Sequence, residues 1–407
     1  MELPVGIATL QHTDRWIGIP LCAILTLLRK IVAPRRPVPR QPRKILFVKF
    51  AEQGSTVLAY PAIRRATEMV GRENVYFVVF EDNRFILDVM EAIPEENVIT
   101  IGTQSPFALA RGALWAVLRA REIGIDAAVD MEFFTRFSAM LTFLSGAKAR
   151  VGFHTFFGDG PYRGDLMTHR LSYNPHLHTS QMFEVMVEAL TRDPALLPTF
   201  DFAPPAEQTF ATFQLRPNER AEIDALLQRE NAQLGSAPII LLNPNASDLL
   251  PLRRWPPQRY IELARRLLER YPDLFIGFTG APAEAAAINR LAHETGSSRA
   301  LGLAGKTTLR QLLVLYTRSE ILVTNDSGPA HFASMTPIHV VTLFGPETPA
   351  LFGARSPRAS ALWAGIACSP CVNACNNRQS TCRNNLCLQA ITVDQVFEEV
   401  NRVYNSR

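Results

Sequence analysis

Short apolar runs alternate with longer amphipathic segments along most of the chain, and this alternation predicts an α/β protein. Short apolar runs are typical of strands buried on both faces, whereas the segments between them have the spacing of helices. In the first half we expect strands at residues 45–48, 75–80, 98–101 and 127–130. We expect helices at residues 56–70, 83–91 and 107–121, and another after Phe134. Strands that alternate with helices predict a parallel sheet covered on both sides.

The second half repeats this alternation after a proline-rich stretch at residues 194–205, which we interpret as an interdomain linker. The expected strands are residues 238–242, 274–278, 320–323 and 339–344, and the expected helices are 257–269, 284–293, 309–317 and 393–404. We therefore expect an N-terminal arm at residues 1–42, a first domain with its linker at 43–205, and a second domain at 206–407. Two such domains predict a cleft between them, with ligands beyond the carboxyl ends of the strands.

One stretch of the first half breaks the pattern. Residues 153–165 are rich in glycine, aromatic and charged side chains and predict a long loop. Long loops in compact domains are often functional, so we expect this loop to contribute to a binding site.

Composition narrows the class of protein. The chain has 407 residues, of which 47% are hydrophobic and 20% charged, which is typical of a globular chain with a large core. The net charge of +4 is only weakly basic, and the globular part has no basic tract interleaved with aromatics, so we expect no nucleic-acid partner. Five of the six cysteines fall between Cys368 and Cys387, and we expect a reducing compartment.

The N-terminal arm has a chemistry of its own. Residues 16–28 contain no charge, and a helix of this length would be about 20 Å long, too short to span a membrane. Residues 29–44 contain seven basic residues and no acidic residue, and prolines keep part of this stretch extended. An apolar helix with a basic flank favours contact of residues 16–44 with an anionic membrane surface. The alternative is a helix packed on the protein itself or on a partner.

The most distinctive polar turn is residues 324–331, TNDSGPAH, which follow a buried-strand run and precede a predicted helix. Ser327 is a favourable N-cap, and Gly328 lets the backbone approach a ligand closely. The free amides of such a helix start favour an anion such as a diphosphate. Asp326 could accept hydrogen bonds from sugar hydroxyls, and His331 could donate to a phosphate. An ordinary capped helix is the simpler interpretation of the turn alone.

Several strand-end motifs together resemble glycosyltransferase family 9, the ADP-heptose:lipopolysaccharide heptosyltransferases. The matching segments are TNDSGPAH at residues 324–331, LFGP at 343–346, RRWP at 253–256, and Gly54 with YPAIR at 60–64. The resemblance covers roughly residues 43 to 400. It implies a GT-B fold, in which two Rossmann-like domains face each other across a cleft. It also implies that the first domain binds the acceptor and that the second binds the nucleotide sugar, with inverting transfer that requires no metal or other cofactor.

The resemblance also assigns donor-side roles. Asp326 matches the position that holds the donor sugar, and Ser327, Gly328 and His331 match the diphosphate contacts. Arg253 matches a basic residue that would clamp the leaving diphosphate. Glu284 matches the position expected to hold the nucleotide ribose, although the helix dipole alone could also favour an acid there. Asn245 and Ser247 lie at the adjacent strand end and could add donors.

The first domain departs from the family at the residue expected to act as the base. The family places an aspartate directly after the glycine of the first turn, and here Ser55 follows Gly54. Inverting transfer needs a group that takes the proton of the acceptor hydroxyl. Glu52, on the same turn, is our first candidate, and Glu132 is our second. The alternative is that Glu52 caps the following helix and that the domain only binds.

The cysteine cluster leaves alternatives open. Its spacings fit no standard zinc finger, and five thiols exceed a tetrahedral site by one. Packed thiols, a disulfide and a structural zinc or iron–sulfur site all remain open. The members of the cluster are Cys368, Cys371, Cys375, Cys382 and Cys387.

The expected function is transfer of a sugar, by resemblance heptose from ADP-heptose, to a lipid-linked glycan such as the lipopolysaccharide core. The expected location is the cytoplasmic face of the bacterial inner membrane. Two alternatives remain: a nucleotide-sugar-binding protein of the same fold without transfer activity, and a transferase that uses another nucleotide sugar. A dehydrogenase is disfavoured because no Gly-x-Gly-x-x-Gly follows a predicted strand.

Overall fold

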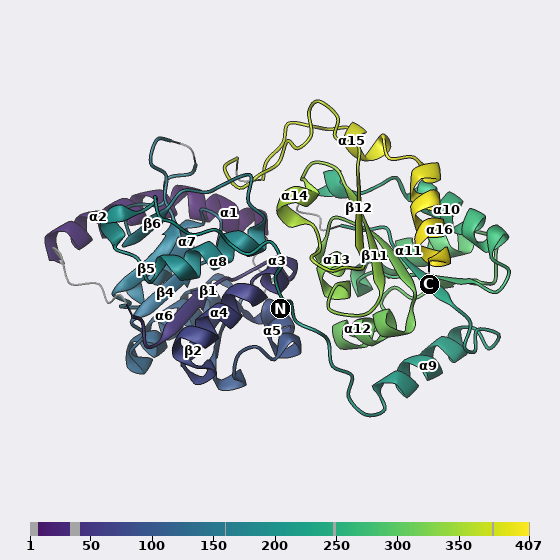
Figure 1. Ribbon diagram of the computed structural model, residues 1–407, viewed down its shortest axis with the longest axis horizontal. Helices are drawn as coiled ribbons and strands as arrows, with labels where there is room; N and C mark the ends of the chain where they lie inside the picture. Colours follow the sequence, from purple (N-terminus) through teal and green to yellow (C-terminus); the bar gives the residue numbers. More distant parts are fainter. Residues whose placement is uncertain (1–6, 33–40, 159, 247–249, 377, 407) are drawn as a thin grey trace. The chain divides into compact units, whose positions relative to one another are not determined.

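The computed structural model of the chain describes residues 7–32, 41–158, 160–246, 250–376 and 378–406. It divides into two compact units (Figure 1). The first unit comprises residues 1–211 together with residues 373–379, and the second comprises residues 212–372 and 380–407. A short piece of the cysteine-rich segment therefore folds with the first unit, although the rest of that segment folds with the second.

The first unit is built on a six-stranded sheet in the order β3-β2-β1-β4-β5-β6, and all of its strand pairs are parallel. Its strands are nearly all buried because helices cover both faces. The strands are β1 (Ile45–Val48), β2 (Val75–Phe80), β3 (Val98–Ile101), β4 (Ala127–Asp130), β5 (Ala149–Phe153) and β6 (His169–Leu171). The helices are α1 (Ile7–Trp16), α2 (Gly18–Val32), α3 (Gln53–Leu58), α4 (Tyr60–Val70), α5 (Arg84–Met90), α6 (Pro106–Ile123), α7 (Arg136–Leu144) and α8 (Thr179–Ala189).

The second unit repeats the design with a sheet in the order β12-β11-β10-β7-β8-β9, again entirely parallel. Its strands are β7 (Ile239–Asn243), β8 (Phe275–Phe278), β9 (Ala300–Gly302), β10 (Ile321–Asn325), β11 (His339–Phe344) and β12 (Ala359–Trp363). Its helices are α9 (Glu219–Glu230), α10 (Pro257–Arg270), α11 (Ala285–Glu294), α12 (Leu309–Arg318), α13 (Gly328–Ala333), α14 (Pro349–Phe352), α15 (Leu386–Gln389) and α16 (Val393–Asn405).

Both sheets have the same strand order, and each has one switch point where the order of connection reverses. In the first unit this point lies between β1 and β4, and in the second unit between β7 and β10. Adjacent strands at a switch point lead into loops that diverge, which leaves a crevice at their carboxyl ends. Each unit thus has one preferred place for a ligand. The predicted α/β class with parallel sheets is confirmed.

Some elements differ from the sequence-based expectation. The strands β5, β6, β9 and β12 and the helix α9 were not predicted, because their segments are short, polar or interrupted by glycine. The helices α1, α8, α14 and α15 were not predicted either. The expected helix at 56–70 is two helices, α3 and α4, which meet at Ala59. Pro61 has no amide to donate, which explains the break. The expected loop at 153–165 is irregular where it is described, but it begins in β5 and is followed by β6.

The N-terminal arm forms a pair of helices that pack on α7. Asp14 accepts hydrogen bonds from the backbone amides of Arg136 and Phe137, at 3.0 and 2.8 Å. Gly18 lies so close to Arg136 that a Cβ there would be 2.9 Å from the arginine side chain. Cys22 is buried in a small cluster with residues of α7 and of the loop after β5. The arm is therefore docked on the first unit, and no described helix is both long enough and apolar enough to cross a membrane.

The buried side chain of Asn325 connects three segments of the second unit by hydrogen bonds. Its Oδ1 accepts hydrogen bonds from the Trp255 amide at 3.0 Å and from the Tyr260 hydroxyl at 3.1 Å. Its Nδ2 donates to the carbonyl of Pro244 at 2.8 Å. One amide thus joins the end of β10 to the segment after β7 and to the start of α10.

We expect Asn325→Ala to destabilise the protein by about 2–4 kcal/mol, because two buried donors would lose their acceptor. Tyr260→Phe is the matched control, since it removes one donor and leaves the other bonds of Asn325 intact, and it should cost less than half as much. Denaturant unfolding of both variants measures the difference. An Asn325→Ala variant no less stable than Tyr260→Phe would show that this amide does not organise the core.

Candidate functional site

The carboxyl ends of β7, β10 and β11 bring together several polar side chains of the second unit. Asn245 follows β7, and Asp326 follows β10 directly. Glu347 lies three residues beyond the end of β11. Because β7 and β10 border the switch point, these residues lie where a ligand is expected.

Arg253 is held between two buried carboxyl groups. It ends a short 3₁₀ turn, Pro251–Arg253, just before the buried Trp255. Its Nη1 lies 3.7 Å from Asp326 Oδ2 and 3.7 Å from Glu347 Oε2. Its side chain is 17% exposed, whereas those of Asp326 and Glu347 are 5% and 3% exposed. The cluster therefore consists of a partly exposed guanidinium and two buried carboxyl groups.

Burial raises the pKa of both carboxyl groups. For Glu347 the nearby charge of Asp326 adds to this effect and raises the pKa well above its usual range, while Arg253 opposes the rise. For Asp326 the opposing effect of Arg253 is the second-largest influence on the pKa. Glu347 is thus the member of the pair that takes up a proton first. When Glu347 is protonated, only the negative charge of Asp326 is left to balance the positive charge of Arg253.

His331 lies one turn into α13 and is buried beside this cluster. Burial and, to a lesser extent, the positive charge of Arg253 lower the pKa of His331 to about 4. The imidazole is therefore neutral at pH 7. Its Nδ1 has no hydrogen-bond partner among the described residues. A neutral imidazole with an unpaired nitrogen can bind a polar ligand atom.

The turn before α13 has the predicted strand–turn–helix form but not the predicted cap. Ser327 occupies the N-cap position, yet its side chain makes no capping bond. Its hydroxyl instead donates to the carbonyl of Asn325, at 3.1 Å. Gly328 starts the helix, which ends at Ala333 and is shorter than expected.

The remaining donor-side candidates are more loosely placed. Asn245 is half-buried at the end of β7. Glu284 lies after β8, and its Oε2 accepts the backbone amide of Ala281 at 2.8 Å. This local contact is the structural alternative considered for Glu284, and its ribose role stays a prediction. Ser247 lies outside the described residues.

In the first unit the switch point brings Glu132 against the end of β1. Its Oε1 accepts the amides of Phe50 at 2.7 Å and of Ala51 at 3.2 Å. The same oxygen lies 3.9 Å from the ammonium of the fully buried Lys49. Two amide donors and one ammonium thus hold this carboxyl group, which gives it a structural role in the turn.

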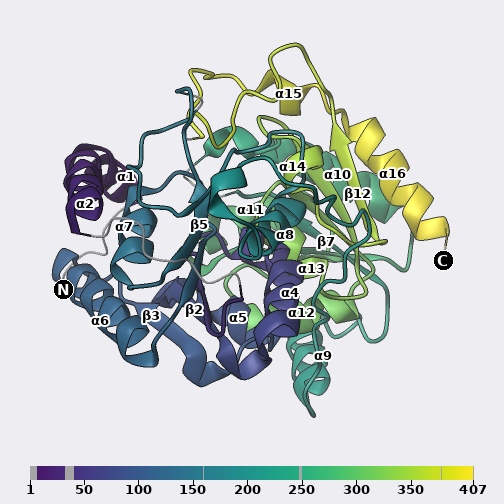
Figure 2. The same ribbon diagram turned by 60° about the vertical axis from the view of Figure 1, so that its left-hand side comes forward.

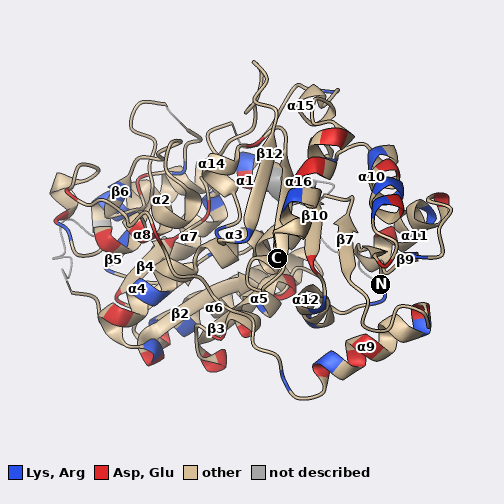
Figure 3. Ribbon diagram, turned by 45° about the vertical axis from the view of Figure 1, so that its right-hand side comes forward, with Lys and Arg blue, Asp and Glu red and all other residues tan. Residues whose placement is uncertain are grey.

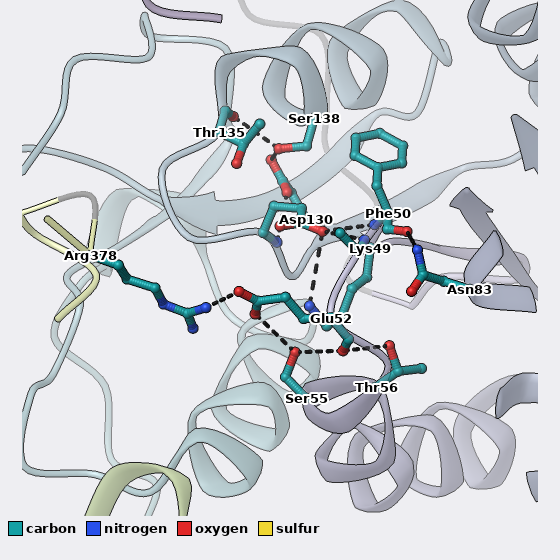
Figure 4. A network of polar contacts seen from close by, with 12 residues as sticks. Lys49, Phe50, Glu52, Ser55, Thr56, Asn83, Asp130, Thr135, Ser138 and Arg378 are labelled. Atoms are coloured by element: carbon teal, nitrogen blue, oxygen red, sulfur yellow. Dashed lines mark hydrogen bonds and ion pairs between the residues drawn. The ribbon is translucent and has the colours of Figure 1, made fainter. Parts of the chain in front are cut away.

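Glu52 occupies the turn between β1 and α3 in a different way (Figure 4). Its backbone adopts the left-handed conformation, with φ of 66°. The Ser55 hydroxyl donates to Glu52 Oε2 at 3.2 Å, and the guanidinium of Arg378 forms an ion pair with Oε1. Glu52 has the N-cap position of α3, but its side chain makes no capping bond. The carboxylate therefore remains 35% exposed, with a hydroxyl and a cation beside it.

Gly54 and Ser55 lie in the first turns of α3 and are both buried. Gly54 carries no side chain that would fill the space beside this turn. Ser55 occupies the position where the resemblance predicts an aspartate, and its hydroxyl donates a hydrogen bond to the Glu52 carboxylate. Ser55 and Glu52, which the sequence analysis assigned to one turn, are thus in direct contact.

A second buried network is connected to this turn through Glu132. Asp130, at the end of β4, is ion-paired with Arg163 and accepts the Ser138 hydroxyl at 3.0 Å. Burial raises the pKa of Asp130 to about 6, although Arg163 and Ser138 oppose the rise. Its Oδ1 also accepts the backbone amide of Glu132 at 3.1 Å. The loop after β5 therefore contributes Arg163 to the foundation of the site.

The cysteine cluster does not assemble a ligand set. All six cysteines lie among the described residues, and none is joined to another in a disulfide. Among the described residues, which include all six, no three His, Cys, Asp or Glu side chains come together as metal ligands. Cys375 folds with the first unit, and the other four cysteines of the cluster fold with the second.

Sequence reasoning did not identify Arg378 or Lys49 and gave no individual role to Glu347 or Arg163, although Glu347 lies at an expected strand end and Arg163 in the expected loop. Glu347 had a visible signal, because it follows the glycine and proline that end β11. Lys49 also follows a strand directly. Arg378 had no local signal, since its partner Glu52 lies at the other end of the chain.

Comparison with known proteins places this arrangement in a family. A model of glycosyltransferase family 9, described as heptosyltransferase, matches residues 111–381. The lipooligosaccharide heptosyltransferase 2 of Haemophilus influenzae is 31% identical over 136 residues, which are 33% of this chain and 39% of that protein. The lipopolysaccharide heptosyltransferase 2 of Escherichia coli K12 is 28% identical over 217 residues, 52% of this chain and 58% of that protein. The matched part thus spans less than two thirds of these curated relatives.

A solved structure gives a fuller match of the fold. The structure of the E. coli ADP-heptose lipopolysaccharide heptosyltransferase II superposes with a TM-score of 0.66 at 20% identity. The match covers 88% of this chain and 98% of that chain. The two parallel six-stranded sheets are thus those of a GT-B fold. Since the family model also covers residues 111–381, from α6 of the first unit through most of the second, the chain belongs to glycosyltransferase family 9.

Proposed function

We propose that this protein is an inverting glycosyltransferase that moves heptose from ADP-heptose to a lipid-linked saccharide such as the lipopolysaccharide core. Family membership and the curated relatives, which are heptosyltransferases, support the reaction class. The name of the structural relative, an ADP-heptose transferase, supports the donor. In this proposal the second unit binds the donor and the first unit supplies the base.

The observation that carries the proposal is the position of Arg253 between Asp326 and Glu347. A diphosphate leaving group gains negative charge as its bond to the sugar breaks, and a fixed guanidinium stabilises that charge. The neutral imidazole of His331 can donate one more hydrogen bond. Arg253 thereby fills the role that a divalent cation has in other transferases, and we propose that no metal is required.

Glu52 is the proposed base. The acceptor hydroxyl oxygen attacks the anomeric carbon, its proton passes to the Glu52 carboxylate, and the bond from that carbon to the diphosphate oxygen breaks. Arg378 and Ser55 orient the carboxylate through the ion pair and the hydrogen bond described above. Burial lowers the pKa of Arg378 to about 10, so the guanidinium is still charged at pH 7. Glu132 is a weaker candidate because two amides and Lys49 already occupy it.

The proposed membrane contact involves the arm. α2 is tied to the first unit by Cys22, by Thr26, whose hydroxyl accepts the Asp165 amide at 2.9 Å, and by the Arg29–Asp165 ion pair. Its opposite face is apolar and exposed, with Leu21, Ile24, Leu27, Leu28 and Ile31, and the exposed Ile17 lies just before the helix. The two interpretations of the arm are thus compatible, since one face packs on the protein and the other faces outward. We propose that this outward face and the basic residues up to Lys44 hold the enzyme on the cytoplasmic face of the inner membrane, where a lipid-linked acceptor would lie.

Transfer can be tested with ADP-heptose and a heptose-deficient lipopolysaccharide, in the presence of EDTA, by measuring ADP release and product mass. We expect the wild type to transfer heptose, and Glu52→Gln to lower kcat at least about 100-fold while ADP still binds. Glu132→Gln is the matched control, since its amide oxygen can still accept both backbone bonds, and it should lose far less.

The outcomes separate the alternatives. A wild type that binds ADP but never releases it from ADP-heptose would support the binding protein without transfer activity. A wild type that uses UDP-sugars instead would support a different donor. A Glu132→Gln variant as inactive as we expect for Glu52→Gln, with Glu52→Gln near the wild type, would move the base to Glu132.

The pH dependence of ADP binding tests the charge cluster. Because the pKa of Glu347 is raised well above its usual range, lowering the pH protonates this group first and removes one negative charge next to Arg253. We therefore expect ADP to bind the wild type more tightly as the pH falls through the raised pKa of Glu347, and Glu347→Gln to lose this dependence. Titration calorimetry at a low and a high pH, on either side of that pKa, measures the effect. Protonation of ADP itself is common to both proteins and cancels in their comparison.

Arg253→Ala tests whether ADP binds at this cluster, because it removes the guanidinium proposed to contact the diphosphate. It should weaken ADP binding about 10- to 100-fold at both pH values. An equal pH dependence in the wild type and in Glu347→Gln would contradict the assigned role of the cluster.

The arm is tested best by outward-facing substitutions, because deleting it would uncover the buried cluster around Cys22. We expect Ile24→Gln with Leu28→Gln to lower partition onto phosphatidylglycerol vesicles at least about tenfold. Leu196→Gln is the matched control, since Leu196 is another exposed leucine of the first unit. Flotation assays measure the bound fraction. A double variant that floats like the wild type would show that this face does not bind lipid.

A further inference from the structure

Helix α6 is apolar on both of its sides, which is unusual for a surface helix. On its inward face Ala116, Val117 and Ala120 are buried in the core, and Leu109, Ala113 and Ile123 pack against that core. Its outward face carries the large apolar side chains. Phe107 is 74% exposed, Leu114 60%, Trp115 57% and Leu118 52%.

These outward residues form one stripe. Positions 107, 114 and 118 recur at helical spacing with Arg111 among them, and Trp115 lies beside them. Helices α9 and α10 instead carry charged residues along their lengths (Figure 3), as helices in contact with water do. Helix α6 thus has apolar side chains on its inner face and large apolar side chains on its outer face as well. Such an exposed patch marks an interaction surface.

Helix α6 lies on the same side of the first unit as α2. Both helices pack on α7, and Figure 2 shows them along one outer side of this unit. Between them α7 adds half-buried apolar side chains from Met140, Phe143 and Leu144. Two apolar helices joined by such a surface can enter one flat interface together.

Charge favours a negative partner. α2 contains no acidic residue and ends with Arg29 and Lys30. On α6, Arg111 is exposed within the apolar stripe, and the one acidic residue, Glu122, is paired with Arg119 at 2.8 Å. In a symmetric dimer through this face, Arg111 and Lys30 would face a surface with the same charge. An anionic lipid surface accepts both the apolar and the basic side chains.

We propose that α6 is a second membrane-contacting helix, and that Phe107, Leu114, Trp115 and Leu118 enter an anionic bilayer beside α2. The proposal extends the membrane contact proposed for the arm and rests on it, but it does not depend on the transfer reaction. Two separated contacts fix the orientation of the first unit on the bilayer, whereas one helix would leave it free to rotate about that helix.

The tryptophans allow a direct test. In full-length Trp16→Phe/Trp363→Phe, the remaining tryptophans are Trp115 on α6 and the buried Trp255. In Trp115→Phe/Trp363→Phe they are Trp16 on the arm and the same Trp255. We expect vesicles of phosphatidylglycerol with brominated acyl chains to quench Trp115 in the first protein and to shift its emission to the blue. The Trp255 emission should be unchanged in both.

The outcomes distinguish the two membrane contacts. Quenching of Trp16 without quenching of Trp115 would overturn the α6 proposal and leave the arm contact intact. Absence of quenching at both positions would overturn both contacts without touching the transfer reaction.

Substitutions on α6 provide the second measurement. Leu114→Gln with Leu118→Gln should lower vesicle partition at least about tenfold, and Leu196→Gln should leave it unchanged. Transfer to a water-soluble acceptor fragment should be the same in all three proteins. A wild type that is dimeric in sedimentation equilibrium and becomes monomeric in the α6 double variant would overturn the proposal in favour of a second copy of the chain.

Discussion

The candidate site of the second unit depends on one buried electrostatic arrangement, in which a single guanidinium is held between two carboxyl groups. Removing Arg253, Asp326 and Glu347 from water is unfavourable, and their mutual attraction offsets this only when the geometry is maintained. The Asn325 amide maintains it by joining the end of β10 to the backbone just after Arg253. The hydrogen bonds of the core thus set the position of the charge that meets the ligand.

The first unit uses the same strand order for a different electrostatic result. Its switch point also lies above buried charges, among them Lys49, Asp130 and Arg163. Here the buried cations are neutralised by Glu132 and Asp130, and the exposed group is the Glu52 carboxylate. One unit therefore presents a cation to its ligand and the other an anion, which suits a pair of sites that stabilise a leaving group and accept a proton.

Much of this arrangement could be predicted from the sequence, because buried parallel strands are continuous apolar runs and ligands bind where such strands end. The strands at 45–48 and 75–80 were predicted with the bounds observed. β5 was missed because Arg150 and Gly152 interrupt its apolar run, and β6 because two of its three residues are polar. The partnership of Glu52 and Arg378 could not be predicted, since only the folded chain brings such distant residues together. The side-chain cap expected from Ser327 was wrong because its hydroxyl bonds to the Asn325 carbonyl instead.

The chain crosses between its two units three times, because residues 373–379 return to the first unit before the last helix forms in the second. During synthesis the first unit can form its sheet early, since domains tend to fold as units in N-to-C order. Its turn at Glu52, however, remains without Arg378 until nearly the whole second unit has left the ribosome. The final electrostatic state of the first unit thus becomes available only when the second is almost fully translated. A ribosome-bound fragment would carry a folded sheet but an unfinished turn.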